Sequence, residues 1–245
     1  MKRPREVFYI GLFDSLPILR DPMLMIVISL FSFLPVLFAY IFAPQPQLAM
    51  QTIVGAIVLS LGFIGLFIAQ SVYFYKYWHR FQDMFVASPV SPLSYAMGLA
   101  FSTLLGAAPA TVVAFILLYL QVPYSVLALL QVLAVTVLFW LSMVFIGYTI
   151  GAVTKNTRRA NSLPQVLGIV LGFLPPVYYT LDTLPPFLQP IALLIPSTNA
   201  AQLAKYYFGL ISISTFEIVF GWVYLIAFVI GMGLVAVRRA HWVDP

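Results

Sequence analysis

The sequence has no cysteine, little charge and only two histidines. Only 8% of its 245 residues are charged, whereas soluble proteins carry roughly 25% charged residues. Without cysteine the chain forms no disulfide bond and has no thiol chemistry. His79 and His241 lie too far apart in the sequence to suggest a metal site. So few charges cannot cover a water-soluble surface, which excludes an ordinary soluble domain.

The motifs of common enzymes are also missing. The sequence contains no G-x-x-x-x-G-K-[ST] phosphate loop, no H-E-x-x-H and no G-x-S-x-G. None of its seven carboxylates lies clearly inside an apolar run. We therefore predict that the chain is not an enzyme and that it has no catalytic, cofactor-binding or metal-binding residues. Any ATP hydrolysis is expected on a partner subunit.

Apolar residues in long runs dominate the sequence. Hydrophobic residues make up 62% of the chain. Their runs reach about 20 residues, the length that a helix needs to cross about 30 Å of hydrocarbon. We predict an all-α membrane protein whose residues 1–245 form a single transmembrane domain. Its six transmembrane helices are expected at about 23–43, 49–75, 93–120, 126–153, 163–179 and 216–237.

Capping residues indicate where some of these helices begin. Asp21 and Pro22 suit the start of the first span, and Ser91 and Pro92 suit the start of the third. Residues 2–20 mix charged and apolar positions without a run long enough to cross. We expect them to form a helix in the membrane interface.

A proline-rich but apolar segment separates the fifth and sixth predicted spans. Residues 187–195 are too short to cross a membrane, and Pro190 interrupts them. We predict a re-entrant hairpin followed by a short helix over 199–208 that Gly209 caps. A seventh span is the alternative, but it conflicts with the distribution of basic residues described next. The prolines assigned to the hairpin are Pro185, Pro186, Pro190 and Pro196.

The basic residues indicate the orientation. Eleven of the 12 lysines and arginines fall within residues 2–20, 76–80, 155–159 and 238–239, which lie on one side of a six-span chain. The positive-inside bias makes that side cytoplasmic, so we predict a multi-pass protein of the cell membrane with both termini in the cytoplasm. Because the basic residues lie between spans rather than in one patch, we expect no nucleic-acid partner.

Three charged residues are expected near the opposite, outer surface. Lys205 is the one basic residue on that side, and Asp182 and Glu217 flank it in the chain. We expect all three to be solvated or paired with one another, the alternative being a role in substrate exit.

The polar stretch 76–88 has two interpretations. Trp78, Phe81 and Phe85 follow i, i+3, i+7 spacing and would form one aromatic ridge on a helix. The ridge could anchor the helix in the membrane interface, or it could dock on a cytoplasmic partner.

Two G-x-x-x-G pairs, Gly147–Gly151 and Gly168–Gly172, allow close helix packing. We favour packing inside one subunit over a dimer seam.

Several motifs in this order resemble those of a known family. Arg20-Asp21-Pro22 precedes the first span, and Ala87-Ser88-Pro89-Val90-Ser91 closes the polar stretch. A basic loop with Asn161 follows before the fifth span. Two proline-containing segments then come in order before the sixth span, Leu184–Pro190 and Ile195–Thr198. The pattern resembles the six-span permease subunits of type-2 ABC exporters. It departs from them at Tyr77 to Phe85, where many members have a Glu-rich stretch containing Gly-Thr.

The resemblance implies a permease that forms half of an outward translocation pathway. Its partners would be two cytoplasmic ABC ATPase subunits, a second permease, usually an identical copy, and membrane lipid. The stretch after the second span would be the cytoplasmic coupling helix, and the hairpin would lie on the outer side. The coupling residues would be Trp78, His79, Arg80, Phe81, Asp83, Met84 and Phe85.

Functions without an ATPase partner stay open. The chain could be a carrier driven by an ion gradient or a structural membrane scaffold. Ion-coupled carriers usually keep an ionisable group near the bilayer midplane, but these spans offer neutral residues such as Gln70, Gln131 and Thr136. A pathway without charge suits an amphipathic cargo, such as a lipid, a glycoconjugate or a drug-like compound.

Overall fold

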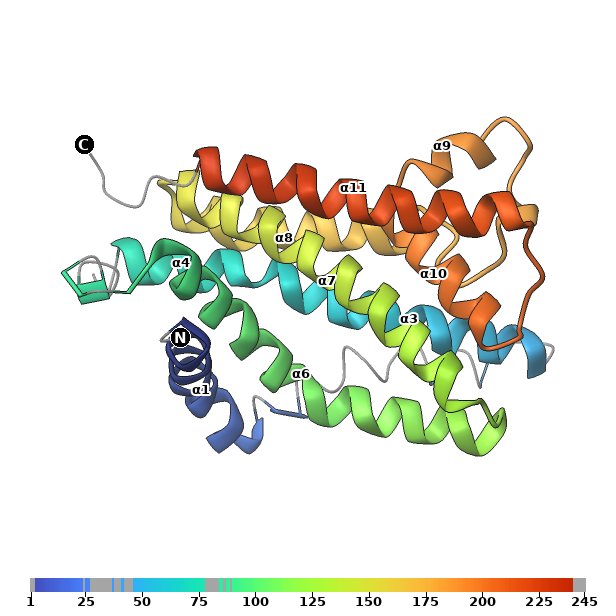
Figure 1. The fold of residues 1–245 in the computed structure, drawn as a ribbon, viewed down its shortest axis with the longest axis horizontal. Helices are drawn as coiled ribbons and strands as arrows, with labels where there is room; N and C mark the ends of the chain where they lie inside the picture. Colours follow the sequence, from blue (N-terminus) through green and yellow to red (C-terminus); the bar gives the residue numbers. More distant parts are fainter. Residues whose placement is uncertain are drawn as a thin grey trace.

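The computed structural model describes residues 3–23, 25–26, 37, 41, 46–77, 84–85, 87–88 and 90–239. Within these ranges all regular structure is helical. The first predicted span, 23–43, lies almost wholly outside the described residues, as does most of the stretch 76–88. The elements shown in Figure 1 are α1 (Arg3–Arg20), α3 (Pro46–Leu66), α4 (Ile68–Tyr77), α6 (Pro92–Gln121), α7 (Val126–Val153), α8 (Thr157–Phe173), η1 (Leu181–Thr183), α9 (Gln189–Leu193), α10 (Pro196–Tyr207) and α11 (Thr215–Arg239).

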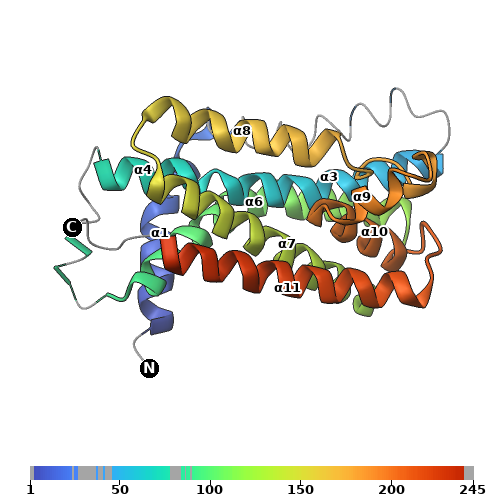
Figure 2. The same cartoon turned by 90° about the horizontal axis from the view of Figure 1, so that it is seen from above.

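The long helices run side by side and alternate in direction (Figure 1). The path of α3 and α4 ends where α6 begins, and α8 begins at the same end, beside the ends of α7 and α11. We call this the basic end, because Lys76, Lys155, Arg158 and Arg238 lie there. The opposite end, which holds α9 and α10, is the hairpin end. Figure 2 shows α1 lying across the long helices at the basic end.

Two helix starts and one helix end confirm the capping predictions. The Ser91 hydroxyl accepts a hydrogen bond from the Ser94 amide at 3.1 Å, and Pro92 occupies the first turn of α6. The Asp21 carboxylate accepts a bond from the Met23 amide at 2.9 Å. At the end of α10, Gly209 has a φ of 71°, a backbone conformation that glycine adopts without steric cost. Its amide donates to the Tyr206 carbonyl at 2.8 Å, as a glycine cap requires.

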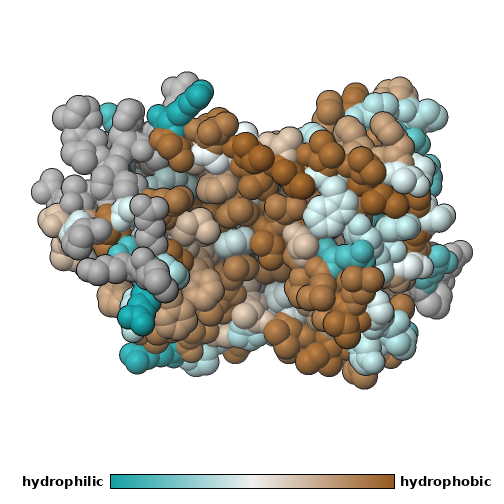
Figure 3. Space-filling view, in the orientation of Figure 1, coloured by the Kyte–Doolittle hydropathy of each residue, from teal (hydrophilic) through white to brown (hydrophobic). Residues whose placement is uncertain are grey.

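The surface pattern suits a membrane. Hydrophobic side chains cover most of the middle of the face in Figure 3, and hydrophilic ones gather toward the two ends. In the described part of the chain, three helices are long and apolar enough to cross a bilayer: Gln47–Tyr77, Val126–Val153 and Thr215–Arg238. A fourth is possible if the two halves of α6, bent by 45° between Pro109 and Thr111, form one span.

The fifth predicted span is wrong in its boundaries. A helix was expected over 163–179, but α8 covers Thr157–Phe173. It begins earlier because the Asn156 side chain caps it, accepting a bond from the Arg158 amide at 2.8 Å. Residues 157–162, expected in a loop, therefore form its first turns. It ends before Pro175 and Pro176, which would interrupt the hydrogen bonding of a longer helix.

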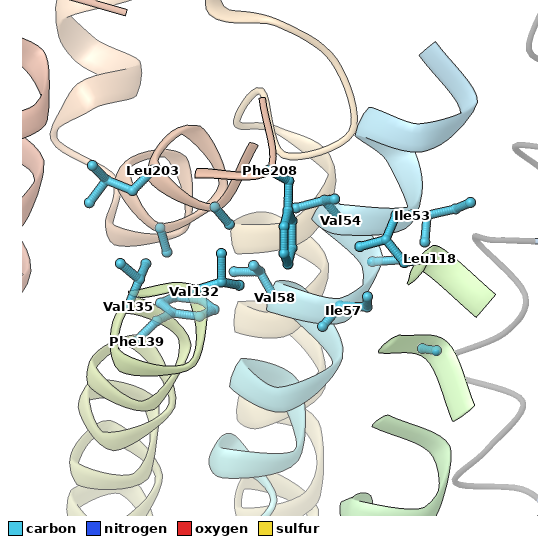
Figure 4. Packing of buried hydrophobic residues seen from close by; sticks show 14 of the residues in the cluster. Ile53, Val54, Ile57, Val58, Leu118, Val132, Val135, Phe139, Leu203 and Phe208 are labelled. Atoms are coloured by element: carbon cyan, nitrogen blue, oxygen red, sulfur yellow. The ribbon is translucent and has the colours of Figure 1, made fainter. Parts of the chain in front are cut away.

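The main core lies between α3, α6, α7 and α10. Figure 4 shows Ile53, Val54, Ile57 and Val58 of α3 facing residues of the other helices. Because the apolar residues come from four helices, one core holds the hairpin end together. Its other labelled members are Leu118, Val132, Val135, Phe139, Leu203 and Phe208.

Both G-x-x-x-G pairs pack inside the chain, as predicted. A Cβ at Gly147 would lie 2.7 Å from the Leu66 carbonyl oxygen, and one at Gly151 would lie 2.5 Å from that of Ala69. The glycines of α8 lie against side chains of α3, Gly168 against Phe63 and Gly172 against Leu59. Since a side chain would clash at these positions, the glycines allow α7 and α8 to approach the α3–α4 path closely.

Candidate coupling region and hairpin

The structure describes two of the seven predicted coupling residues, and these two differ in environment. Met84 is 59% exposed, whereas Phe85 is half-buried. The ring of Phe85 lies 5.0 Å from the ring of Tyr95, at an interplanar angle of 46°. Phe85 therefore packs on its own subunit, and Met84 faces away from it. The other predicted coupling residues, Trp78, His79, Arg80, Phe81 and Asp83, lie outside the described residues.

Phe85 joins a core cluster at the basic end. Its partner Tyr95 is fully buried in α6, where it shares the cluster with Ile10 of α1, Val72 of α4 and Val144 of α7. Through Phe85, the stretch that precedes α6 is connected to four helices.

Asp14 provides a polar connection in the same region. Its carboxylate accepts hydrogen bonds from the Tyr75 hydroxyl of α4 and the Ser102 hydroxyl of α6. Ser102 is buried, so the contact lies inside the protein. One carboxylate thus joins α1 to two of the long helices. The sequence did not single out Asp14 for this role, because an acidic residue in an amphipathic segment is ordinarily solvated.

The packing of α1 against α6 is close. A Cβ at Gly98 would lie 2.6 Å from the Ile10 Cβ, and one at Gly11 would lie 2.9 Å from the Gly98 carbonyl oxygen. Away from this contact, Tyr9 and Phe13 are more than half exposed, and Phe8 lies at the edge with its ring 6.1 Å from that of Phe101 in α6. The helix therefore has an inner face that packs on the bundle and an outer aromatic face.

The four hairpin prolines do not form one cluster. Pro185, Pro186 and Pro190 are exposed, whereas Pro196 is buried at the start of α10. In Figure 1, α8 ends and α11 begins at the hairpin end, and α9 and α10 lie between them in the chain. The segment before η1 packs tightly on α3, because a Cβ at Gly55 would lie 2.2 Å from the Val177 carbonyl oxygen.

α10 is buried along almost its whole length. Every residue from 196 to 205 is buried, although five of them are polar or charged and one is a proline. The Ser197 hydroxyl donates to the Leu171 carbonyl at 2.7 Å, and the Asn199 amide donates to the Leu193 carbonyl at 2.6 Å. These bonds connect α10 to the end of α8 and to α9. The helix is therefore part of the interior and not a surface loop.

The expectation that Lys205 is solvated or paired with a carboxylate is wrong. Lys205 has no exposed surface, and its ammonium donates to the carbonyl oxygens of Tyr179 at 2.7 Å and Pro176 at 3.5 Å. Burial lowers the pKa of the Lys205 ammonium. In the sequence, the only signal at this position is that Lys205 is the one basic residue outside the four basic segments.

The two acidic residues near Lys205 in the chain have other environments. Glu217 accepts bonds from the Ser214 amide at 2.7 Å and from the Ser214 hydroxyl at 2.6 Å. This is a capping box, Ser-x-x-Glu, at the start of α11. Asp182 is exposed in η1. Neither carboxylate is available near the ammonium because Glu217 is engaged in its own helix cap and Asp182 faces outward.

These features define a membrane-embedded helical protein. Its helices are held together at the basic end by the Tyr95 cluster and Asp14, and a buried helix, α10, lies at the hairpin end. No group of three or more His, Asp or Glu that could hold a metal occurs among the residues that the structure describes. The family model for ABC-2 type transporters matches residues 7–208. The chain belongs to the ABC-2 type transporter family, which confirms the resemblance seen in the motifs.

The family match also defines the general role of the chain. Members of this family are membrane subunits of transporters, are generally not themselves catalytic and normally pair with ABC ATPase subunits. No curated protein matches the chain significantly.

Proposed function

We propose that this chain is the permease subunit of an ABC exporter. It forms half of a translocation pathway with a second copy of itself, and two cytoplasmic ATPase subunits drive the transport. The family match over residues 7–208 is the observation that carries this proposal. The absence of a phosphate loop from the sequence agrees with ATP hydrolysis on a separate subunit.

The proposed topology has six spans, with both termini in the cytoplasm and the protein in the cell membrane. Three helices long enough to span, and the bent α6 as a fourth, support part of it. The remaining two spans would be residues 23–43 and α8 with the residues after it. The basic residues at one end of the bundle support a cytoplasmic position for that end. The exposed aromatic face of α1 supports its position in the interface.

The proposed site of ATPase coupling is the stretch Lys76–Ser88. Met84 would contact the ATPase, because it is exposed at the basic end. Phe85 would transmit movement to the permease, because its ring packs on Tyr95. Docking of this kind concentrates binding energy in a few apolar side chains, as at other protein interfaces. The re-entrant hairpin would then line the outer end of the pathway, and the cargo would be amphipathic.

Co-purification tests the partnership. The tagged chain, expressed at low level in its native host and extracted in mild detergent, should retain a P-loop ATPase in stoichiometric amount. The complex should hydrolyse ATP, and replacing the phosphate-loop lysine of the ATPase should abolish hydrolysis. The chain alone should show only background activity.

Reconstitution distinguishes the alternatives. If the chain without any ATPase moves an amphipathic probe across liposomes in response to an ion gradient, it is a carrier and the proposal is wrong. If it binds no ATPase and moves no probe, a structural scaffold is the better interpretation.

A further inference from the structure

The ammonium of Lys205 is incompletely coordinated. An ammonium has three N–H donors. One of them makes a short bond of 2.7 Å to Tyr179, and a second reaches the Pro176 carbonyl only at 3.5 Å. The third has no partner among the described residues, and no carboxylate neutralises the charge there. Buried charges in proteins are normally paired and fully hydrogen-bonded.

Two other buried donors lie on the same face of α10. Thr198, Gln202 and Lys205 are spaced i, i+4, i+7, which places them one above another on a helix. Thr198 is fully buried and Gln202 is 7% exposed. Within the described part of the chain, the Thr198 hydroxyl and the Gln202 side-chain nitrogen have no hydrogen-bond partner. Buried polar groups are rarely left unpaired in this way.

The three side chains share one chemical requirement, which is an acceptor. Lysine donates only, and the free atoms of Thr198 and Gln202 can also donate. An acceptor with several oxygens and a negative charge would satisfy all three and would neutralise the ammonium. Phosphate and carboxylate groups have these properties. A water molecule would provide an acceptor without the charge.

We propose that the face of α10 formed by Thr198, Gln202 and Lys205 is a binding site for an oxyanion of the phosphate or carboxylate class. The site does not depend on the ATPase partnership, because all three residues belong to this chain.

A purely structural role for Lys205 makes a different prediction. In that case its bonds to Tyr179 and Pro176 serve only to hold the preceding segment against α10. Lys205→Gln keeps an N–H donor for the Tyr179 carbonyl but removes the charge. A structural contact should tolerate this change, whereas an anion site should lose affinity. Lys205→Arg keeps the charge and should retain binding.

The test measures the thermal unfolding midpoint of the purified full chain in mild detergent. Two probes are titrated separately: inorganic phosphate, and dioleoylphosphatidylglycerol in mixed micelles, with diacylglycerol as the uncharged lipid control. We expect a saturable rise in the midpoint with one or both anionic probes and none with diacylglycerol. A response to phosphatidylglycerol alone identifies a lipid headgroup as the ligand, and a response to phosphate identifies a free anion.

Variants locate the response. Lys205→Gln should weaken the apparent affinity at least tenfold. The double variant Thr198→Val with Gln202→Leu should do the same. Because it keeps Lys205, it tests the site even if Lys205→Gln does not fold. Ser197→Ala removes a buried hydroxyl that already has a partner, and Arg238→Gln removes an exposed cation at the other end. Neither should alter the response. Unchanged affinity in the Thr198 and Gln202 double variant, or no response of the wild type to either anion, would overturn the proposal.

Discussion

Phe85 packs its ring against Tyr95, with the ring centroids 5.0 Å apart. Of the three aromatic residues predicted to form one ridge, Phe85 is therefore already in contact with the permease itself. Truncation of Phe85 would change both the fold and any contact with a partner. Experiments on coupling should separate these two effects.

Phe85→Ala should destabilise the permease itself. Because the side chain is half-buried, the free energy of unfolding should fall by about 1–3 kcal/mol, less than for a fully buried phenylalanine. Met84→Ala should leave the stability nearly unchanged, since Met84 is exposed. Thermal unfolding of both variants in detergent measures the difference. Equal loss in the two variants would show that the Phe85–Tyr95 contact contributes little.

Phe81→Ala should release the ATPase, and Arg80→Ala should largely retain it. Truncation of a buried aromatic anchor at an interface can cost about 2 kcal/mol or more, whereas an exposed ion pair contributes about 0–1 kcal/mol. The measurement is recovery of the ATPase on the tagged permease, with both variants present in the membrane in normal amounts. If Phe81→Ala keeps the ATPase and its activity, the stretch is only a membrane anchor.

Asp14→Ala should loosen α1 from the bundle. The change removes the carboxylate that accepts from the Tyr75 and Ser102 hydroxyls, which should cost about 1–3 kcal/mol, although Ser102 keeps its bond to the Leu99 carbonyl at 2.8 Å. Hydrogen exchange in residues 3–20 should accelerate as α1 detaches. Asp182→Ala, which removes an exposed carboxylate at the hairpin end, serves as the control and should leave this exchange unaltered. Equal exchange in wild type and Asp14→Ala would contradict the role of Asp14.

Gly147→Ala should disturb the packing of α7 on the end of α3. The new methyl group would lie 2.7 Å from the Leu66 carbonyl oxygen, a backbone atom that cannot rotate away. Such overpacking costs about 1–3 kcal/mol. The matched control is Gly231→Ala in α11, where no atom lies within 4 Å of the added carbon. That change should be neutral or stabilising by up to about 1 kcal/mol, and a destabilisation equal to that of Gly147→Ala would argue against the packing explanation.

Reporter fusions should define the topology. Fusions near residues 122 and 182 should be found outside the cell, and fusions near 85, 157 and 245 should be found inside. The first two positions belong to the hairpin end of the bundle, and residues 85 and 157 belong to the basic end. An external C-terminus would be incompatible with six spans.

The amount of the fold that could be predicted differed between elements. Helix α7 was predicted with its observed boundaries, because an uninterrupted apolar run defines it. In the structure the Ser125 side chain caps its start. Helix α8 was misplaced by six residues at both ends. Its first turn is basic and polar, so hydropathy did not mark it, and the Asn156 cap was not recognised. The site at the basic end was predicted only in part, since the sequence contains no local sign that Phe85 turns inward.

The sequence by itself determined the class of protein, the general order of the helices and the family. Long apolar runs, capping residues and the one-sided distribution of basic residues are local features, and each depends on only a few neighbouring residues. The tertiary structure decided the environments of Phe85, Asp14 and Lys205. Asp14 reaches Tyr75 and Ser102 across 61 and 88 positions of the chain, and Lys205 reaches the carbonyls of Pro176 and Tyr179 across 29 and 26 positions. Contacts between distant segments depend on how the helices pack together, which no local pattern specifies.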